Sequence, residues 1–144
     1  MDREALLEAF GAFPQRLGSA ARAAAGEPVA AGEWGPPEVV RHLVAVEREV
    51  WQARITQVAV EDNPHWGWTE PGLDPSLEGA SLATILAAFE AARGVTHAMV
   101  AALDDAGWRR SGTHATYGVR DVGGLLDLAI DHDREHLEGI VNPS

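Results

Sequence analysis

Cysteine and lysine are both absent from the 144 residues of this chain. Without cysteine the chain can form no disulfide, no thiolate nucleophile, no iron–sulfur cluster and no cysteine-ligated zinc site. Without lysine it has neither the lysine of a P-loop nor an amine for Schiff-base chemistry. Any tightly bound metal ion must therefore be held by histidine, aspartate or glutamate.

Positive charge is also scarce, because 11 arginines stand against 22 acidic residues and give a formal net charge of −11. A surface this acidic repels the phosphates of nucleic acids and the headgroups of anionic membranes. No apolar stretch approaches the ~20 residues of a membrane span, and the N-terminus lacks the basic and apolar regions of a signal peptide. We therefore expect a cytoplasmic protein with no nucleic-acid partner and no membrane partner.

Apolar residues recur at helical spacing in four long segments, at about residues 2–25, 36–60, 81–106 and 119–140. Pro36 suits the first turn of the second helix, and Ser81 suits the N-cap of the third. The intervening residues 61–80 and 107–118 are expected to be loops, and the sequence shows no convincing strand pattern. We predict a single domain over residues 1–144 with an all-α fold, a four-helix bundle.

Two of the six histidines, His132 and His136, stand four residues apart in the last predicted helix and therefore share one face of it. They extend the apolar line through Leu128, and His42 shares the inward phase of Val46 in the second helix. Imidazoles placed in this way can bind one cation at roughly 2.0–2.1 Å, and the cation offsets the cost of burying them. The pattern predicts a metal site formed by His42, His132 and His136.

Other interpretations of the last helix compete with this one. The pair could be a solvent-edge feature beside Asp133 and Glu135 on an acidic face. Residues 132–136 also match the His-x-x-Glu-His motif of inverted zincins, but that chemistry needs a further ligand well downstream, and the chain ends too soon after His136 to supply one. Glu135 remains a candidate general base, although it lies about 100° round the helix from His136.

Three stretches of the sequence resemble the DinB-like superfamily, which includes the YfiT-type metal-dependent hydrolases. They are residues 33–43 with Glu47, residues 112–121, and the closing motif His132-Asp133-x-x-His136-Leu137. Gly35 departs from the family's usual serine, which affects helix capping and not chemistry.

The resemblance implies a four-helix bundle with a long crossover connection, and a divalent ion, zinc or nickel, held by His42, His132 and His136. It also implies a homodimer and an activity on a small molecule. Characterised relatives include thiol transferases and isomerases that use mycothiol, bacillithiol or glutathione.

Three neutral histidines leave at least one coordination position open, which is typical of catalytic metal sites. Such a site can activate water or an incoming thiolate, and a chain without cysteine would need a low-molecular-weight thiol from outside. Arg54 and Arg120 are candidates for binding an anionic substrate, although we favour solvated surface positions for both. The sequence leaves two functions open: a metal-dependent thiol transferase or hydrolase, and a non-catalytic metal-binding or stress-related protein with a structural or vestigial site.

Residues 61–80 include His65, Trp66 and Trp68, which could cover the open metal position. The favoured alternative is that the tryptophans anchor a long loop to the bundle or meet a partner subunit.

The remaining polar candidates are expected to have structural roles. We interpret Glu49 as a solvated or interface charge and His97 as a hydrogen-bonded core histidine. His114 and Tyr117 are interpreted as residues of a turn.

Overall fold

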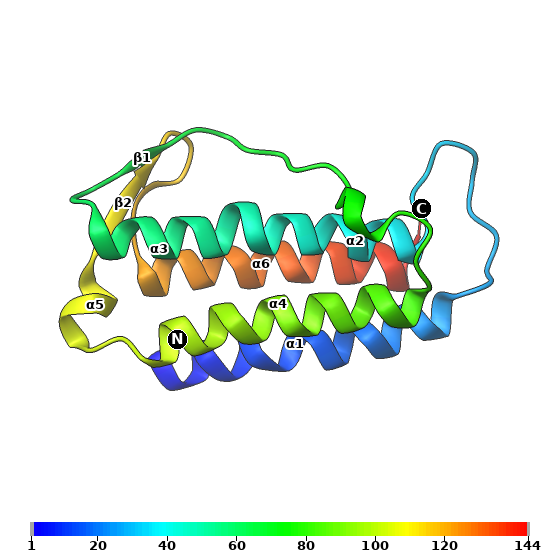
Figure 1. Cartoon of the computed structure of the whole chain (residues 1–144), viewed down its shortest axis with the longest axis horizontal. Helices are drawn as coiled ribbons and strands as arrows, with labels where there is room; N and C mark the ends of the chain where they lie inside the picture. The colour runs from blue at the N-terminus through cyan, green and yellow to red at the C-terminus, as the bar shows by residue number, and fades with distance from the viewer. Residues whose placement is uncertain (1, 144) are drawn as a thin grey trace.

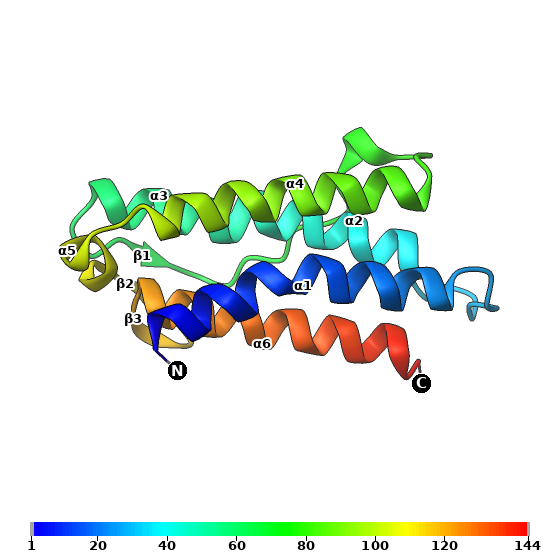
Figure 2. The same cartoon turned by 90° about the horizontal axis from the view of Figure 1, so that it is seen from below.

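The computed structural model describes residues 2–143, and four long rods of helix lie side by side in it as a bundle (Figures 1 and 2). The second rod is continuous and contains α2, a π-helical segment and α3. The rods span α1 Arg3–Ala24, α2 Pro36–Val46 with the π-helical Glu47–Gln52 and α3 Ala53–Val60, α4 Leu82–Ala101, and α6 Val122–Val141. The predicted four-helix bundle is confirmed.

A long crossover connects the second and third rods. The rod α2–α3 and α4 run in the same direction, opposite to α1 and α6, so residues 61–81 must return along the whole bundle (Figure 1). This segment holds only a single 3₁₀ turn, Pro75–Leu77, and a two-residue strand. The crossover expected from the resemblance is present, and it passes over the rod α2–α3.

Helix starts agree with the capping residues in the sequence. The Ser81 side chain accepts a hydrogen bond from the Thr84 N–H at 3.2 Å, and Pro36 opens α2. Gly35 makes no side-chain cap, and the Glu38 carboxylate instead accepts from the Gly35 N–H at 3.4 Å. None of the helices within residues 2–143 is both long and apolar enough to cross a membrane.

A small three-stranded sheet at one end of the bundle contradicts the expectation that the chain has no strands. It contains β1 His65–Trp66, β2 Ser111–His114 and β3 Gly118–Asp121. Strand β2 lies between the other two, parallel to β1 and antiparallel to β3. Strands of two to four residues are too short to show an alternating pattern, and β1 pairs with a segment far away in sequence.

The prediction of a loop at residues 107–118 is also partly wrong. The third helix ends at Ala101, and a short helix, α5 Asp105–Arg109, follows before β2. The Asp104 side chain caps α5 by accepting from the Gly107 N–H at 2.8 Å, so the chain begins a new helix where one continuous helix was expected. The last helix begins at Val122 because β3 occupies the residues before it.

A buried cluster of charges crosses the core of the bundle. Arg93 of α4 donates from two nitrogens to Asp133 of α6, each at 2.9 Å, and from Nε to Glu47 at 3.0 Å. Its Nη1 also donates to the Phe10 carbonyl of α1 at 2.9 Å. Pro14 has no backbone N–H, so it cannot donate the helical hydrogen bond to the Phe10 carbonyl four residues earlier. That carbonyl is therefore free to accept from Arg93. Arg93 therefore contacts all the other rods.

This cluster places two carboxylates against one guanidinium inside the core. Asp133 is 3% exposed, which contradicts the alternative interpretation in which it belonged to an acidic face at the solvent edge. Burial raises the pKa of Asp133 to about 6, although hydrogen bonds and charge from Arg93 act in the opposite direction. Within the described chain, Glu47 Oε2 is buried with no hydrogen-bond partner. Buried ions in such a cluster are tolerated only while they remain paired.

We predict that Arg93→Met lowers the free energy of unfolding by about 3–5 kcal/mol, because the methionine leaves two buried carboxylates without a counter-ion. Urea denaturation measures this change. Arg134→Met is the matched control, since Arg134 pairs with Asp131 on the surface, where loss of an ion pair costs about 1 kcal/mol or less. Equal losses in the two variants would contradict a structural role for the buried cluster.

Candidate metal site

The structure brings the three predicted histidines together between two rods. His42 lies on α2, and His132 and His136 lie one turn apart on α6. One ring nitrogen of each lies within 4.8 Å of those of the other two, and the Nε2 atoms of His132 and His136 are 3.2 Å apart. Nitrogens that bind one tetrahedral ion at 2.0–2.1 Å are about 3.3 Å apart. The pair on α6 is therefore already at the spacing of two ligands.

Hydrogen bonding and burial set the protonation of the rings. His42 is buried, and its Nδ1 lies 3.3 Å from the Gly72 carbonyl oxygen of the crossover. Donation from Nδ1 to that oxygen leaves the Nε2 lone pair free, which is the usual arrangement behind a metal-binding histidine. Burial, with a smaller contribution from neighbouring histidines, lowers the pKa of His132 and of His136 to about 4. Both rings are consequently neutral at pH 7.

The donor set fits a divalent transition-metal ion, because neutral imidazoles are suitable ligands for several such ions. The remaining ring nitrogen of His132, Nδ1, is buried without a partner in residues 2–143, so His136 is the only polar contact of that ring. A cation shared with its neighbour would use the nitrogen that faces His136.

The histidines line one side of a cavity of about 400 Å³. This volume lies within the range of small-molecule sites. The second rod, the crossover, the β2–β3 turn and α6 all contribute to its walls. Besides the histidines, the lining residues are Trp34, Val46, Val50, Trp51, Arg54, Trp68, Thr69, Glu70, Pro71, His114, Tyr117, Leu128, Asp131 and Glu135.

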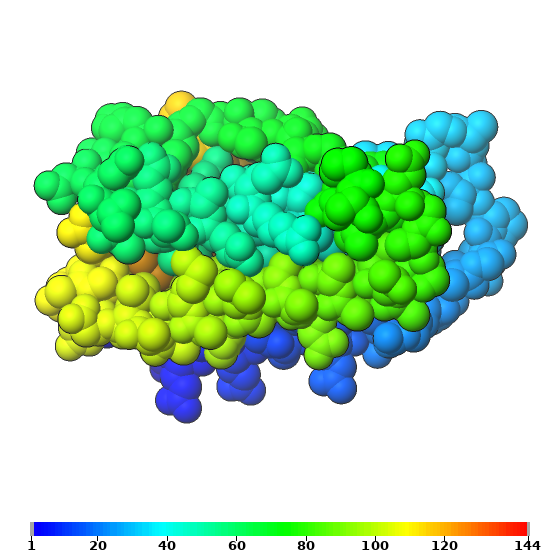
Figure 3. Space-filling model, viewed as in Figure 1, coloured from blue at the N-terminus to red at the C-terminus, as the bar shows by residue number. Residues whose placement is uncertain are grey.

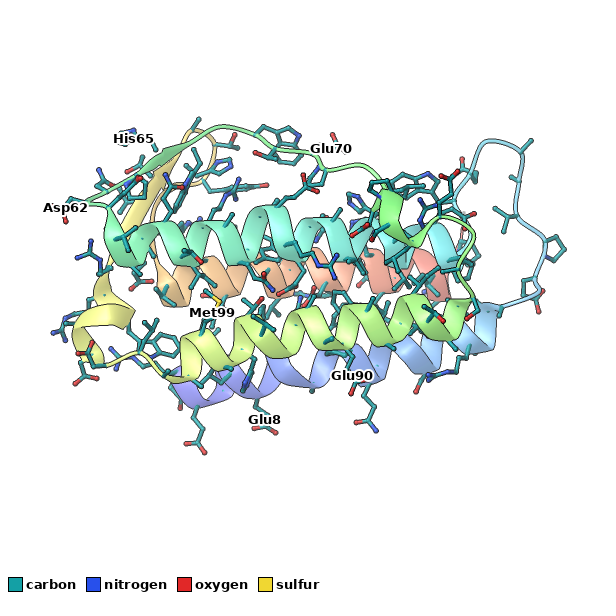
Figure 4. The ribbon with its side chains drawn as sticks, viewed as in Figure 1. Glu8, Asp62, His65, Glu70, Glu90 and Met99 are labelled. Atoms are coloured by element: carbon teal, nitrogen blue, oxygen red, sulfur yellow. The ribbon has the colours of Figure 1, made fainter. Side chains whose placement is uncertain are left out.

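The crossover both anchors itself to the bundle and forms a wall of the cavity. Trp66 donates from Nε1 to the Gln57 side chain at 2.7 Å. Its ring packs so closely against Gly112 that a Cβ at this position would lie only 2.3 Å from the ring. Trp68 is exposed but lines the cavity. His65 is exposed at the outer end of the crossover and is not among the lining residues (Figure 4). The space-filling view shows the crossover along the upper edge of the second rod (Figure 3).

The expectation of a solvated surface position is wrong for Arg54. Its side chain is 7% exposed and lines the cavity, and its Cζ lies 5.9 and 5.4 Å from the ring centroids of Trp51 and Trp66. Arg120 lies outside the cavity lining, and its Nε donates to the Tyr117 carbonyl at 3.1 Å. Twelve residues separate His42 from Arg54, which in a regular α-helix places them about 120° apart round the axis, so the sequence spacing gave no signal for Arg54.

His114 and Tyr117 have the turn role that we expected. The Nδ1 of His114 accepts hydrogen bonds from the backbone N–H groups of Thr116 and Tyr117 at 3.0 and 3.3 Å. Both residues also line the cavity, which sequence reasoning missed because it depends on where the hairpin docks.

Three further expectations concern Glu49, His97 and Glu135. Glu49 is exposed, as expected, and His97 is hydrogen-bonded, with Nε2 3.1 Å from the Leu7 carbonyl oxygen. Glu135 is exposed and lies at the cavity, so its role as a general base stays a prediction.

Comparisons with known proteins agree with this fold. A family model described as the DinB superfamily matches residues 3–140. Among solved structures, YfiT from Bacillus subtilis superposes with a TM-score of 0.73 at 19% identity, over 97% of this chain and 86% of YfiT. That protein is described as a probable metal-dependent hydrolase with an unusual four-helix bundle topology. No curated protein sequence matches the chain.

We predict that the metal-free protein loses stability as the pH falls from about 6.5 to about 4. Imidazoles of the unfolded chain take up protons near pH 6.5, whereas His132 and His136, with pKa values of about 4, resist protonation in the fold. Acid therefore favours unfolding. Urea denaturation at several pH values should show a shallower dependence in the double variant His132→Gln/His136→Gln.

The raised pKa of Asp133 acts in the opposite direction, but this residue is present in both proteins and cancels in the comparison. His65→Gln, at an exposed position, is the control and should behave like wild type. An equally steep pH dependence in the double variant would show that the two partly buried rings do not titrate as described.

Proposed function

This chain belongs to the DinB superfamily, and we propose that it is a metal-dependent enzyme in which His42, His132 and His136 bind one divalent cation. The observation that carries this proposal is the convergence of three imidazole nitrogens within 4.8 Å, at the wall of a cavity of about 400 Å³. Structural sites are usually closed by four protein ligands, whereas three ligands beside a cavity leave a position for water or substrate.

A bound divalent ion would polarise a substrate group and lower the pKa of a coordinated water or thiol. The residues of this chain prepare the site for such an ion. Gly72 orients His42 through its carbonyl, and burial keeps His132 neutral. The ring of Trp51 stands at 72° to that of His132 with centroids 6.1 Å apart, so it covers one side of the site.

We propose zinc or nickel as the ion and a small molecule as the substrate. The description of YfiT as a probable metal-dependent hydrolase supports hydrolysis, and the resemblance described above supports thiol transfer. Because the chain has no cysteine, thiol chemistry here would require a low-molecular-weight thiol as cosubstrate. Glu135, one of the acidic residues that line the cavity, is the side chain that we propose to accept a proton from a nucleophile.

We predict that the untagged protein binds about one equivalent of Zn²⁺ or Ni²⁺ and that His132→Ala weakens this binding by more than about 100-fold, beyond what loss of an outer-shell partner costs. Isothermal titration and elemental analysis measure the affinity and the stoichiometry. His65→Ala, which removes an exposed imidazole outside the cavity, should bind metal like wild type. Equal affinity in His132→Ala and wild type would reject the three-histidine site.

We also predict that the metal-loaded protein turns over a substrate and that chelation abolishes this activity. The assay combines glutathione, bacillithiol or mycothiol with an electrophile such as monochlorobimane, and a parallel arm screens esters and amides for hydrolysis. Activity should be lost in His132→Ala and kept in His65→Ala. A protein that binds metal at full stoichiometry but is inactive in both arms would contradict the proposed enzymatic activity and favour the non-catalytic alternative.

A further inference from the structure

Arg54 is a buried cation without an anionic partner. The side chain is 7% exposed, and within residues 2–143 it forms no ion pair. Its one hydrogen bond is a long one of 3.5 Å from Nη2 to the Gly67 carbonyl. Arg93, the other deeply buried arginine, is by contrast held by two carboxylates. A guanidinium carries five N–H donors, so most of those on Arg54 remain free to bind a ligand in the cavity.

Two indole rings hold this guanidinium in place. The Cζ of Arg54 lies 5.9 Å from the ring centroid of Trp51 and 5.4 Å from that of Trp66. Attraction to the ring faces offsets part of the cost of burial without using the N–H donors. Trp66 is itself fixed by Gln57 and by the close packing over Gly112. Burial still lowers the pKa of Arg54, as expected for a cation without a counter-ion.

His114 provides a second donor in the same cavity. Its Nδ1 accepts from the N–H groups of Thr116 and Tyr117, so the proton of the neutral ring must be on Nε2. Burial, followed by the nearby charge of Arg54, lowers the pKa of His114 and keeps the ring neutral. Within residues 2–143 the hydrogen bonds of this ring are both made by Nδ1, so Nε2 can donate to a ligand in the cavity that the residue lines.

These donors and the histidine cluster line the same cavity, and Trp51 contacts both Arg54 and His132. The ring of Trp51 lies 6.1 Å from that of His132, and Arg54 packs against the same indole. Among the described residues that line the cavity, Arg54 is the only arginine. The three acidic lining residues are all exposed, namely Glu70, Asp131 and Glu135. Figure 4 shows Glu70 on the crossover, above the second rod.

We propose that Arg54, with His114, binds an anionic group of the substrate, a carboxylate or a phosphate. This inference rests on the proposed function, because it places the reactive end of the same molecule at the three histidines. The substrate is then a small molecule that carries an anionic group and a reacting group and fits within the cavity of about 400 Å³. A buried guanidinium is costly without a counter-ion, and a substrate anion supplies one.

The test is a titration of the full-length, metal-free, ¹⁵N-labelled protein monitored by its indole N–H signals in NMR spectra. The signals of Trp51 and Trp66 are assigned with Trp51→Phe and Trp66→Phe. The probes are acetate, inorganic phosphate and the neutral acetamide. Acetate or phosphate should shift both signals saturably, and the tighter of the two identifies the preferred anion. Acetamide should have no such effect.

Arg54→Gln should weaken anion binding by about tenfold or more, because it removes charge-assisted hydrogen bonds. Arg109→Gln is the matched control, since it removes the same charge from an exposed position on α5, and it should bind like wild type. Equal anion affinity in Arg54→Gln and wild type would overturn the inference. Equal responses of wild type to acetate and acetamide would overturn it too, and that comparison decides the matter if Arg54→Gln does not fold.

The use of metal-free protein separates this inference from the proposed function. A chain that binds anions through Arg54 but no metal would contradict the metal site and leave the anion subsite standing. A chain that binds metal but whose anion affinity is independent of Arg54 would contradict the anion subsite and leave the metal site standing.

Discussion

The guanidinium of Arg93 sets the register in which the two histidine-bearing rods face each other. It binds Glu47, which follows α2 directly, and Asp133, which lies between His132 and His136 in sequence. A shift or rotation of either rod would break a charge-assisted hydrogen bond inside a low-dielectric core, where an unpaired ion is costly. The packing of the bundle therefore contributes directly to the alignment of the three imidazoles.

The π-helical segment Glu47–Gln52 explains why one rod can serve both the charge cluster and the cavity. In an α-helix, residues four apart in sequence are rotated by about 40° from one another round the axis, so a series of them soon turns away from one face of the helix. The wider π turn reverses that drift, and π-helical turns are frequent at functional sites. Residues 42, 46, 50 and 54 consequently all line the cavity. Glu47, from the same rod, meets Arg93. The rod thus brings Arg54 into the same cavity as the three histidines.

Sequence reasoning succeeded where the physical signal is local. Helical periodicity located the rods. The spacing of His132 and His136 places the two rings on one face of their helix, regardless of which rod packs against it. The unpredicted features depend on pairs far apart in the chain. Arg93 meets Phe10 and Asp133 across the core, and strand β1 pairs with β2 across the whole of α4. Arg54 is buried by the crossover and the hairpin, whose course no helical pattern encodes.

X-ray absorption spectroscopy of the zinc-loaded protein is the decisive measurement of whether three imidazoles from two rods bind one divalent ion. We expect a first shell with three imidazole nitrogens at about 2.0–2.1 Å and one further light-atom ligand. The multiple-scattering signature of imidazole identifies the histidines in that shell. A shell of oxygen ligands alone, or one with a single imidazole, would contradict this expectation.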